Sequence, residues 1–429
     1  SATKQINVLS YSDMEKLVTA KPGRHIINFR VEPDRIWCEY DKKIPERLAI
    51  RIFLGQGLEH WTPKTIRDLG CGGSETAMAM ITKELARRDC QPIIYAMNHE
   101  VWDGVVYRHF STYRPDNIGC HLFITSRVPE VFNDNIPSLQ KWAWAHDISF
   151  FHRLTPNLAE KIDVVVALSH WHIGNIKRTY PWLGDAEVWD MENNEITYQD
   201  TEIFQQYETE AKITKIPKLV IIGNALYDTE RFEQNIERVP YRFIWCSSPD
   251  RGLEELLKMW PLIKTKLPNA QLKIFYGWEY FDSTLFMAEQ RKFKQNILLL
   301  LKQDGVEWCG RVGQEQLARE LLQSDIMLYP PHPFRETYGI AFLEAQAAGV
   351  LIFYRKNGAL GETIGNRGIP LDLNLSPEQI VNTILETLDN KEKCDDLRKR
   401  AKEYALSRTW EKQAGKVLEV YERCKGLTL

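Results

Sequence analysis

Three features are missing from this sequence of 429 residues, and each absence excludes a class of protein. No run of 18 apolar residues is present, which argues against a membrane-spanning helix. The eight cysteines show neither Cys-x-x-Cys nor a Cys/His ligand spacing, which argues against a structural zinc site and a disulfide framework. The net charge of -3 gives no basic surplus, so a nucleic-acid partner is not expected.

The remaining composition is that of a soluble globular protein, with 44% apolar and 26% charged residues. The length is sufficient for two domains that each have a core. The scattered cysteines favour reduced thiols and therefore a cytoplasmic location. The first residues, Ser-Ala-Thr-Lys-Gln, have no signal-peptide character. They lack an initiating Met, which leaves open that the chain is processed or is part of a longer protein.

The stretch from Tyr329 to Gly349 is the most informative part of the sequence. A short apolar strand over 326–329 ends in two prolines, which cannot continue a sheet ladder. A helix is expected from Gly339 to about Ala348, with a glycine as its stop. The start of a helix that closely follows a strand offers unpaired N–H groups and a positive dipole end, which suit a phosphate.

Two carboxylates flank the start of this helix. Glu336 lies on the loop before it and Glu344 lies inside it, with seven residues between them. Carboxylates accept hydrogen bonds from hydroxyls, here on either side of the phosphate. A diphosphate with a sugar at each end has this pattern of charge and hydroxyls. The stretch therefore predicts a nucleotide-sugar site, with two solvated glutamates on an ordinary strand–helix unit as the alternative.

These residues also carry a resemblance to a known family. Glu336 and Glu344, followed by Ala-Gln-Ala-Ala-Gly, resemble the donor-site signature of retaining glycosyltransferases of family 4, which have the GT-B fold. The preceding Ser-Asp-Ile-Met-Leu-Tyr-Pro-Pro and the later Gly-Glu362 strengthen the likeness. The resemblance covers about residues 48–425. It implies two Rossmann-like, doubly wound domains that face each other across a cleft.

Strands alternate with helices along the chain, which independently predicts an α/β protein with parallel, doubly wound sheets. In the second half, strands are expected over 243–246, 272–276, 326–329 and 350–354, with a strand and turn over 306–312. Helices that close the chain are expected over 377–389, 391–406 and 409–424.

Three parts of the chain follow from this pattern and the resemblance. Residues 1–236 are predicted to form an N-terminal, acceptor-side Rossmann-like domain. Residues 237–407 are predicted to form the nucleotide-sugar donor domain. The final helix, in 408–429, is expected to cross back to the first domain. Nothing in residues 1–45 indicates a function.

An acidic segment is inserted in the first domain at about 184–212. Nine acidic residues and no Lys or Arg lie between Asp185 and Glu210, interleaved with aromatic residues such as Trp189 and Phe204. Such a run is typical of a solvated surface insertion. The alternative is a flap that recognises the acceptor, because aromatic faces stack on sugar rings.

A glycine turn, Asp68 to Gly73, precedes an amphipathic helix expected over 76–88. It superficially matches the S-adenosylmethionine loop of Rossmann-like methyltransferases. That loop needs an apolar strand running directly into its Asp, and residues 61–67 are not one. The other interpretation is Gly-Gly-Ser-Glu at a helix N-terminus, which resembles the N-domain loop of family 4 glycosyltransferases. There Gly72 and Gly73 would approach the donor phosphate, since glycine has no Cβ. A purely structural tight turn is the third interpretation.

A strand expected over 141–148 ends in His146 and Asp147. Residues at the carboxyl end of a parallel strand face the crevice of an open α/β sheet. The resemblance implies that His146 lies beside donor and acceptor, and Asp147 is assigned to the acceptor. A hydrogen-bonded structural histidine is the alternative.

Departure of a nucleoside diphosphate places negative charge on its β-phosphate, which cations, N–H dipoles or a metal must stabilise. No Asp-x-Asp is present, which argues against a metal-dependent GT-A enzyme. The predicted stabilising groups are Arg251, the helix start near 338–340, and the Gly72–Gly73 turn across the cleft. Ser247 or its neighbour stands where the family has an arginine, so that one cation is either missing or supplied elsewhere, with Arg311 and Lys356 as the candidates.

Carried over residue by residue, the resemblance implies the following roles. Glu336 would bind hydroxyls of the transferred sugar and stabilise its developing positive charge, and Glu344 would accept hydrogen bonds from the ribose. The implied catalytic residues are Glu336, His146 and Arg251. The implied donor-binding residues are Gly72, Gly73, Ser247, Arg251, Gly310, Val312, Thr337, Tyr338, Gly339, Ile340 and Glu344, with Gly310 and Val312 at the base. Asp147 is placed at the acceptor, and no metal ligand is predicted.

The predicted function is transfer of a hexosyl or related sugar, with retention, from a UDP- or GDP-linked donor to a glycan, lipid or protein-linked acceptor. No metal or other cofactor is expected. The alternatives are a methyltransferase that uses the Asp68–Gly73 loop and a non-catalytic, GT-B-like carbohydrate-binding protein. The base, the sugar, the acceptor, the oligomeric state and a peripheral membrane contact are left open.

Overall fold

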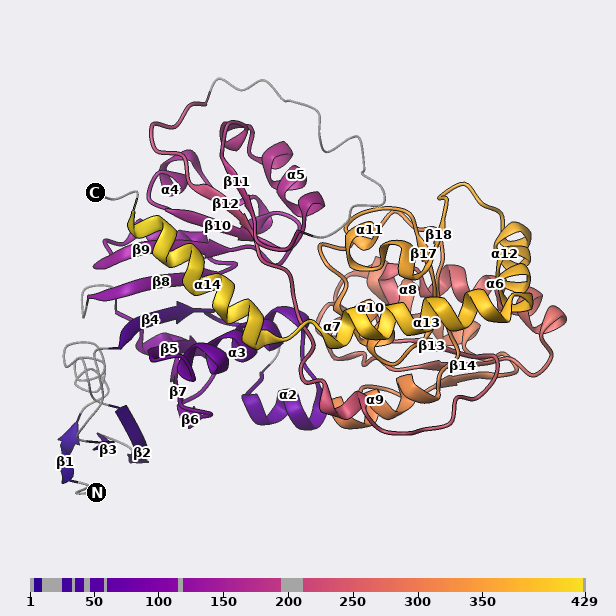
Figure 1. Ribbon diagram of the computed structural model, residues 1–429, viewed down its shortest axis with the longest axis horizontal. Helices are drawn as coiled ribbons and strands as arrows, with labels where there is room; N and C mark the ends of the chain where they lie inside the picture. Colours follow the sequence, from indigo (N-terminus) through magenta and orange to yellow (C-terminus); the bar gives the residue numbers. More distant parts are fainter. Residues whose placement is uncertain are drawn as a thin grey trace.

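Two α/β domains lie side by side in the computed structural model of the chain, and the C-terminal helices extend over both (Figure 1). Each domain is built on a largely parallel sheet. The predicted α/β class with two Rossmann-like domains is therefore confirmed. The structure describes residues 4–9, 25–32, 35–41, 47–57, 60–114, 119–193 and 211–426.

The N-terminal domain contains a nine-stranded sheet of order β11-β12-β10-β9-β8-β4-β5-β7-β6. Its neighbours pair in parallel, apart from the antiparallel β6 and β7. The strands are β4 (Leu48–Phe53), β5 (Cys90–Ala96), β6 (Glu100–Trp102), β7 (Val105–His109), β8 (Cys120–Ser126), β9 (Ser138–Trp144), β10 (Val164–Ala167), β11 (Val188–Asp190) and β12 (Lys218–Ile221).

Helices cover both faces of this sheet. They are α2 (Pro63–Leu69), α3 (Gly73–Ala86), α4 (Pro156–Ala159) and α5 (His170–Thr179). On β4, Ile50 and Ile52 point into the core beneath α3, whereas Ala49 points into the core beneath α4 and α5. This alternation follows from the two-residue period of a strand, and it explains why the central strands are apolar throughout.

The C-terminal domain has a six-stranded sheet of order β15-β14-β13-β16-β17-β18, in which every neighbouring pair is parallel. The strands are β13 (Arg242–Trp245), β14 (Gln271–Ile274), β15 (Val306–Trp308), β16 (Ile326–Tyr329), β17 (Leu351–Arg355) and β18 (Ile369–Leu371). The helices are α6 (Leu253–Lys266), α7 (Glu279–Ser283), α8 (Ala288–Leu300), α9 (Gln314–Gln323), α10 (Ile340–Ala347), α11 (Leu360–Thr363), α12 (Pro377–Asp389) and α13 (Lys391–Leu406).

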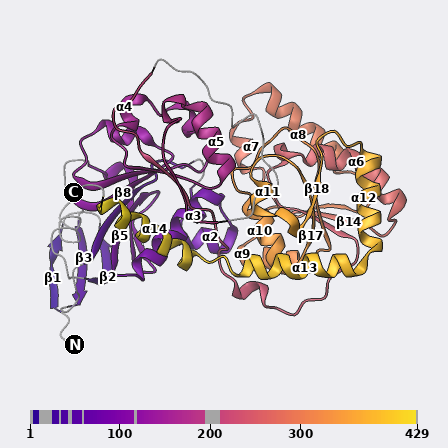
Figure 2. The ribbon, with the colours of Figure 1, turned by 45° about the horizontal axis from the view of Figure 1, so that its top comes forward.

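Near the N-terminus of the chain, three strands form a separate antiparallel sheet of order β1-β3-β2. The strands are β1 (Lys4–Leu9), β2 (His25–Glu32) and β3 (Arg35–Asp41). A second view shows this small sheet beside the N-terminal domain, at the end of the molecule far from α6 and α12 (Figure 2).

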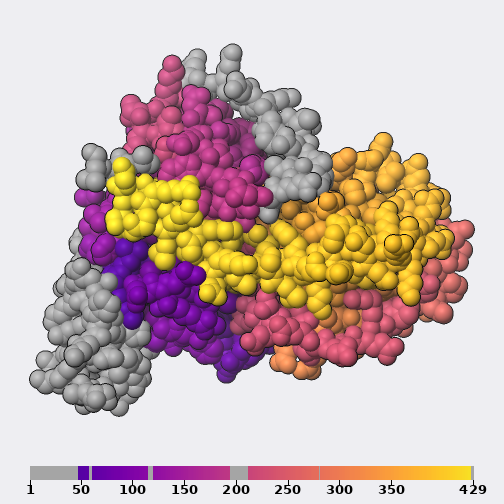
Figure 3. Space-filling model, viewed as in Figure 1, coloured from indigo at the N-terminus to yellow at the C-terminus, as the bar shows by residue number. Residues whose placement is uncertain are grey.

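The last helix, α14 (Trp410–Lys425), returns to the N-terminal domain and packs along α3. In the space-filling view the C-terminal segment forms one continuous band across both domains (Figure 3). The chain crosses between the domains twice, once after β12 and once before α14. The two crossings meet where Leu226 pairs with Thr409 in an isolated parallel bridge. The predicted domain boundary near residue 236 lies just after the first crossing.

A buried carboxylate joins the two crossings. The Glu192 side chain is 3% exposed and accepts from Arg408 Nη1 at 2.7 Å, from Lys416 Nζ at 3.0 Å and from Gln413 Nε2 at 2.8 Å. The backbone N–H of Gly223 also donates to it at 2.8 Å. Burial opposes ionisation, but the charges of Arg408 and Lys416 outweigh it and lower the pKa of Glu192 to about 2.

This network predicts an acid-dependent loss of stability. Because the pKa of Glu192 is lower in the folded protein than its ordinary value of 4.5, the network stabilises the fold above pH 4.5 and is lost as the pH falls toward 2. The loss amounts to roughly 3 kcal/mol. Denaturation across this range should show it in the wild type and in Glu419→Gln, a control on the exposed face of α14. Glu192→Gln should lack it, and an unchanged pH dependence in that variant would contradict the prediction.

The acidic segment differs in part from the solvated insertion that was expected. Its first residues form β11 at the edge of the sheet, Asp190 accepts from His170 Nε2 at 2.8 Å, and Glu192 is buried in the network above. Glu192 is buried because Arg408 and Lys416, which are distant in the sequence, neutralise its charge. The predicted acceptor flap falls mainly on residues 194–210, which lie outside the described residues.

Other sequence expectations differ in detail. Residues 63–69 form helix α2, which was not predicted. The hydroxyls of Thr62 and Thr65 each accept from the other's backbone N–H, and Pro63 occupies the first turn. Helix α3 begins at Gly73, before the expected start at 76. Of the strand and turn predicted over 306–312, the strand is Val306–Trp308.

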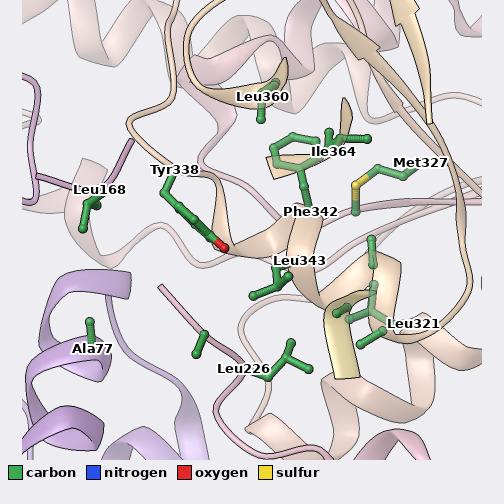
Figure 4. Close-up of a cluster of buried hydrophobic side chains, with 14 of the residues drawn as sticks. Ala77, Leu168, Leu226, Leu321, Met327, Tyr338, Phe342, Leu343, Leu360 and Ile364 are labelled. Atoms are coloured by element: carbon green, nitrogen blue, oxygen red, sulfur yellow. The ribbon is translucent and has the colours of Figure 1, made fainter. Parts of the chain in front are cut away.

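A hydrophobic core continues from one domain into the other. Ala77 and Leu168 of the N-terminal domain belong to the same buried cluster as Tyr338, Phe342 and Leu343 of the C-terminal domain, and Figure 4 shows them around a shared region. The domains are therefore held together by apolar packing as well as by the covalent crossings. Among the described helices, none is both long and apolar enough to cross a membrane.

Candidate functional site

The glycine turn of the N-terminal domain faces the start of α10 in the C-terminal domain. A Cβ atom at Gly73 would lie 3.6 Å from Cγ2 of Ile340, and a Cβ at Gly70 would lie 3.3 Å from the carbonyl oxygen of Val312. Gly73 begins α3 and Ile340 begins α10, so two helix starts lie against each other at the boundary between the domains. Both are ends with unpaired N–H groups that suit an anion.

Glycine is required in the turn for a specific reason. Gly70 has φ of +76°, a region that side chains disfavour. A Cβ at Gly72 would lie 2.5 Å from Oε2 of Glu75, whose carboxylate is held by Ser74 Oγ at 2.8 Å and by Arg127 Nη1 at 2.8 Å. The turn therefore places backbone without side chains at the boundary with the C-terminal domain.

Gly310, one of the two residues predicted at the base, borders open space. Its φ is +71°, and a Cβ there would meet no atom within 4 Å. Val312 is partly buried and lies against Gly70. The structure thus brings the predicted residues of the glycine turn, Gly310 and Val312 together from two domains.

Glu336 lies between β16 and α10, and its side chain is 7% exposed. The hydroxyl of Tyr329 donates to its Oε1 at 2.8 Å. Nη1 of Arg251 is 3.2 Å from both carboxylate oxygens. Two predicted catalytic residues from different loops are therefore in direct contact, because the parallel strands β13 and β16 are neighbours and both end here.

A buried arginine that sequence reasoning missed supports this pair. Arg355, at the end of β17, is fully buried, with its guanidinium 3.7 Å from the ring centre of Tyr329. It donates to the carbonyl oxygens of Pro330 at 3.2 Å and of Arg251 at 2.6 Å. It therefore fixes both Tyr329 and the backbone of Arg251. No motif marked it, because an arginine at the end of a strand is usually exposed.

The loop after β17 fixes the backbone of Glu336. Ala359 N–H donates to the carbonyl oxygen of Glu336 at 2.9 Å. A Cβ at Gly358, which has φ of +58°, would lie 2.9 Å from both N and O of Glu336. A glycine at 358 is thus needed for this close approach.

Thr337 connects the two domains. Its Oγ1 donates to the carbonyl oxygen of His146 at 2.9 Å, and its carbonyl oxygen accepts from Ser169 Oγ at 2.9 Å. Nearby, Glu362 accepts from the N–H of His170 at 2.7 Å and of Trp171 at 3.0 Å, and so caps the start of α5 from the other domain. Burial raises the pKa of Glu362, although these N–H bonds oppose it. The sequence likeness included Glu362 without a role.

His146 follows β9 by two residues and is 6% exposed. Among the described residues, neither of its ring nitrogens has a hydrogen-bond partner. Burial, followed by the charge of Arg127 and the proximity of His172, holds the pKa of His146 well below its ordinary value. The imidazole is therefore neutral at pH 7, with one donor and one acceptor nitrogen.

Asp147, the predicted acceptor residue, belongs to a charged cluster on the N-terminal side. Arg127 lies 2.8 Å from Asp147 Oδ2 and 2.8 Å from Glu75 Oε1. Burial raises the pKa of Asp147, Arg127 counteracts it, and Glu75 adds to it. Sequence reasoning missed Arg127, which follows β8 and adopts φ of +67°.

Glu344 is not free on its helix. Its Oε1 is 3.1 Å from Arg231 Nη2, and the two side chains are 10% and 4% exposed. Arg231 also donates to the carbonyl oxygen and to Oε1 of Gln314, at 2.9 and 2.7 Å. One carboxylate oxygen of Glu344 is therefore occupied, which the sequence did not indicate because Arg231 lies 113 residues away.

The remaining predicted residues are placed as follows. Ser247 is buried, and its carbonyl oxygen accepts from Trp245 Nε1 at 2.7 Å. Tyr338 is buried in the core that the two domains share. Gly339 is the left-handed residue before α10. Arg311 lies 5.4 Å from the ring centre of Tyr276, and Lys356 lies 3.6 Å from Asp372.

The methyltransferase interpretation lacks its required geometry. Asp68 is an exposed residue in helix α2 and forms an ion pair with Arg67 at 2.7 Å. It does not follow a strand, because α2 separates β4 from the glycine turn. Within the described ranges, no three His, Cys, Asp or Glu side chains are grouped as metal ligands.

Comparisons with known proteins relate the C-terminal domain to a family. Residues 243–404 match the family described as "Glycosyl transferases group 1". Over 129 residues the chain is 30% identical to the GDP-mannose-dependent monoacylated alpha-(1-6)-phosphatidylinositol monomannoside mannosyltransferase of Corynebacterium glutamicum. The aligned region covers 28% of this chain and 31% of the relative. The chain spans about a third of the length of the curated relatives it matches.

Solved structures share most of the architecture. Sucrose-phosphate synthase from Thermosynechococcus elongatus has a TM-score of 0.61 at 13% identity, covering 89% of this chain and 100% of that one. Anabaena HepE, solved with UDP and glucose, has a TM-score of 0.59 at 14% identity, covering 88% and 100%. Identities this low show the fold alone. The chain therefore has the GT-B glycosyltransferase fold, and its residues 243–404 match the glycosyl transferases group 1 family.

Proposed function

We propose that the chain is a retaining glycosyltransferase that moves a sugar from a UDP- or GDP-linked donor to a carbohydrate-bearing acceptor without a bound metal. The observation that carries this proposal is the buried Glu336, held by Tyr329 and Arg251 just before α10, whose start lies against the start of α3. Departure of a nucleoside diphosphate creates negative charge on the phosphate and positive charge on the sugar. A cation and unpaired N–H groups stabilise the first, and a carboxylate stabilises the second.

In the proposed reaction, an acceptor hydroxyl oxygen bonds to C1 of the sugar while the bond from C1 to the β-phosphate oxygen breaks. The proton of the hydroxyl passes to that phosphate oxygen. Attack on the face from which the diphosphate leaves retains the anomeric configuration, and no enzymatic nucleophile is required.

Glu336 would bind the sugar hydroxyls and stabilise the positive charge that develops at C1. Arg251 and the starts of α3 and α10 would stabilise the negative charge on the phosphate. The neutral His146, with both ring nitrogens unpartnered among the described residues, suits a hydrogen bond to a sugar hydroxyl. The free oxygen of Glu344 would accept from the ribose.

A donor screen tests this proposal. Wild-type protein is incubated with UDP-, GDP- and ADP-sugars, and release of the free diphosphate is measured with and without EDTA. One donor is expected to be turned over at the same rate in both conditions, and its diphosphate at 100 times its Kd should add roughly 2.7 kcal/mol of stability.

Each part of the proposal has its own contradicting outcome. Loss of activity in EDTA that added Mg²⁺ restores would contradict the metal-free mechanism. An inverted product anomer in the NMR spectrum would contradict retention. Diphosphate binding without turnover would indicate a non-catalytic protein, and binding of S-adenosylmethionine alone would favour the methyltransferase.

A further inference from the structure

The loop that follows His146 and Asp147 has an unusual backbone. Phe151 and His152 have φ of +48° and +58°, in the left-handed region that residues other than glycine rarely adopt. The Phe151 side chain is nevertheless 58% exposed. An exposed aromatic ring on an unfavourable backbone is not explained by burial in the core, and such strain concentrates at functional sites.

Neighbouring elements hold this loop in place. On α5, Asn175 Nδ2 donates to the carbonyl oxygen of Ile148 at 2.8 Å. His172 accepts from Leu168 N–H on Nδ1 at 3.1 Å, so that its Nε2 donates to the carbonyl oxygen of Asp147 at 2.7 Å. Burial lowers the pKa of His172 to about 4, which keeps this neutral form at pH 7. Helix α5 therefore holds the backbone of the loop, while the ring of Phe151 is exposed to solvent.

Polar contacts join Phe151 to the charged cluster of Arg127, Asp147 and Glu75. The guanidinium of Arg153 lies 5.3 Å from the Phe151 ring centre, and its Nη2 donates to the carbonyl oxygen of Arg127 at 2.8 Å. Arg127 in turn holds Asp147 and Glu75. The exposed ring thus lies on the same rigid framework as the predicted acceptor residue.

The charges of this framework indicate which class of ligand it suits. Two cations, Arg127 and Arg153, are each paired with carboxylates, since Arg153 Nε is 3.1 Å from Glu130 Oε1. Arg251 also acts on Asp147, but it is itself paired with Glu336. With four carboxylates against three guanidinium groups, no positive charge is left over for a phosphate or an anionic membrane. An aromatic face beside ion-paired side chains suits a neutral sugar ring, which offers C–H groups to the ring and hydroxyls to the carboxylates.

We propose that Phe151 is the platform on which the terminal pyranose ring of a neutral glycan acceptor stacks, with Asp147 and Arg127 binding its hydroxyls. This inference rests on the proposed transfer reaction and names its acceptor class. The strained backbone then has a function, because it turns the ring toward the acceptor.

Saturation-transfer NMR on the full chain tests the platform, with methyl α-mannopyranoside and methyl α-glucopyranoside as probes. Phe151→Gly removes the ring and suits a φ of +48°, so this variant should melt at or above the wild-type temperature. Phe151→Trp keeps an aromatic face. Phe286→Ala is the matched control, because Phe286 is a more exposed phenylalanine (80%) in the other domain, between α7 and α8.

The wild type, Phe151→Trp and Phe286→Ala are expected to bind at least one pyranoside, with the strongest saturation on C–H protons of one ring face. Phe151→Gly should bind roughly ten-fold more weakly, since one aromatic contact is worth about a factor of ten in affinity. Absence of binding to the wild type, or equal binding by Phe151→Gly, would overturn the inference.

Two further measurements separate this inference from the proposed function. Binding of UDP and GDP is measured by calorimetry on the same variants, and it should be equal in Phe151→Gly and the wild type. If the diphosphates bind but the pyranosides ignore Phe151, the platform is wrong and the donor site stands. Cosedimentation with phosphatidylglycerol vesicles that is lost in Phe151→Gly would assign the ring to a lipid surface and would also overturn the inference.

Discussion

Replacing Glu336 by alanine is expected to lower kcat for diphosphate release about 10²- to 10³-fold, because the carboxylate stabilises charge that develops only in the transition state. The substitution also leaves the Tyr329 hydroxyl without its acceptor and Arg251 without its ion-pair partner. Single-turnover release of the diphosphate from a pre-bound donor measures the effect separately from donor binding.

Glu336→Gln distinguishes charge from shape. The amide oxygen still accepts from Tyr329, but the negative charge is absent, so kcat should fall nearly as far as in the alanine variant. Glu320→Gln is the control. Glu320 is partly buried and forms an ion pair of its own, with Lys273 of β14 at 3.2 Å. A Glu336→Gln variant that keeps more than about a tenth of wild-type kcat would remove Glu336 from the proposed mechanism.

Replacing Arg231 by alanine is expected to lower the free energy of unfolding of the C-terminal domain by about 3–5 kcal/mol. The change leaves the Glu344 carboxylate, 10% exposed, without its cationic partner at 3.1 Å. It also breaks the two bonds from Arg231 to Gln314. A urea titration followed by tryptophan fluorescence measures the shift of the midpoint.

The double variant Arg231→Met with Glu344→Gln provides the test of this explanation. It removes both charges, so most of the lost stability should return, whereas Arg231→Met alone should stay unstable. The exposed pair of Arg400 and Asp396, at 2.8 Å, is the control, and Arg400→Ala should cost under about 1 kcal/mol. Equal costs for Arg231→Ala and Arg400→Ala would show that Glu344 does not need its partner.

The local sequence was sufficient where short-range rules decide the structure. The helices at 377–389 and 391–406 have the predicted bounds, because caps such as Ser376 and Asn390 fix their starts. Strand β16 and helix α10 also lie where prolines and glycines placed them. Helix α2 was not predicted, although Thr62 and Pro63 are a signal for the start of a helix.

The partners of the predicted site residues were not readable from the sequence. Arg127 and Arg231 are joined to the carboxylates of Glu75 in α3 and Glu344 in α10 only because folding brings together segments that are distant in the chain. Periodicity cannot reveal a buried arginine such as Arg355, since its cost of burial is offset by groups that folding alone brings near it.

By itself the sequence determined the α/β alternation and the stretch from Tyr329 to Gly349, because strand, turn and helix signals act over a few residues. Only the tertiary structure decided that Glu336 is held by Arg251 and Tyr329, and that Glu362 caps α5 in the other domain. It also decided that Phe151 is exposed on a left-handed backbone beside Asp147. These contacts depend on how parallel strands align at their carboxyl ends and on how two domains pack, and no local pattern encodes either.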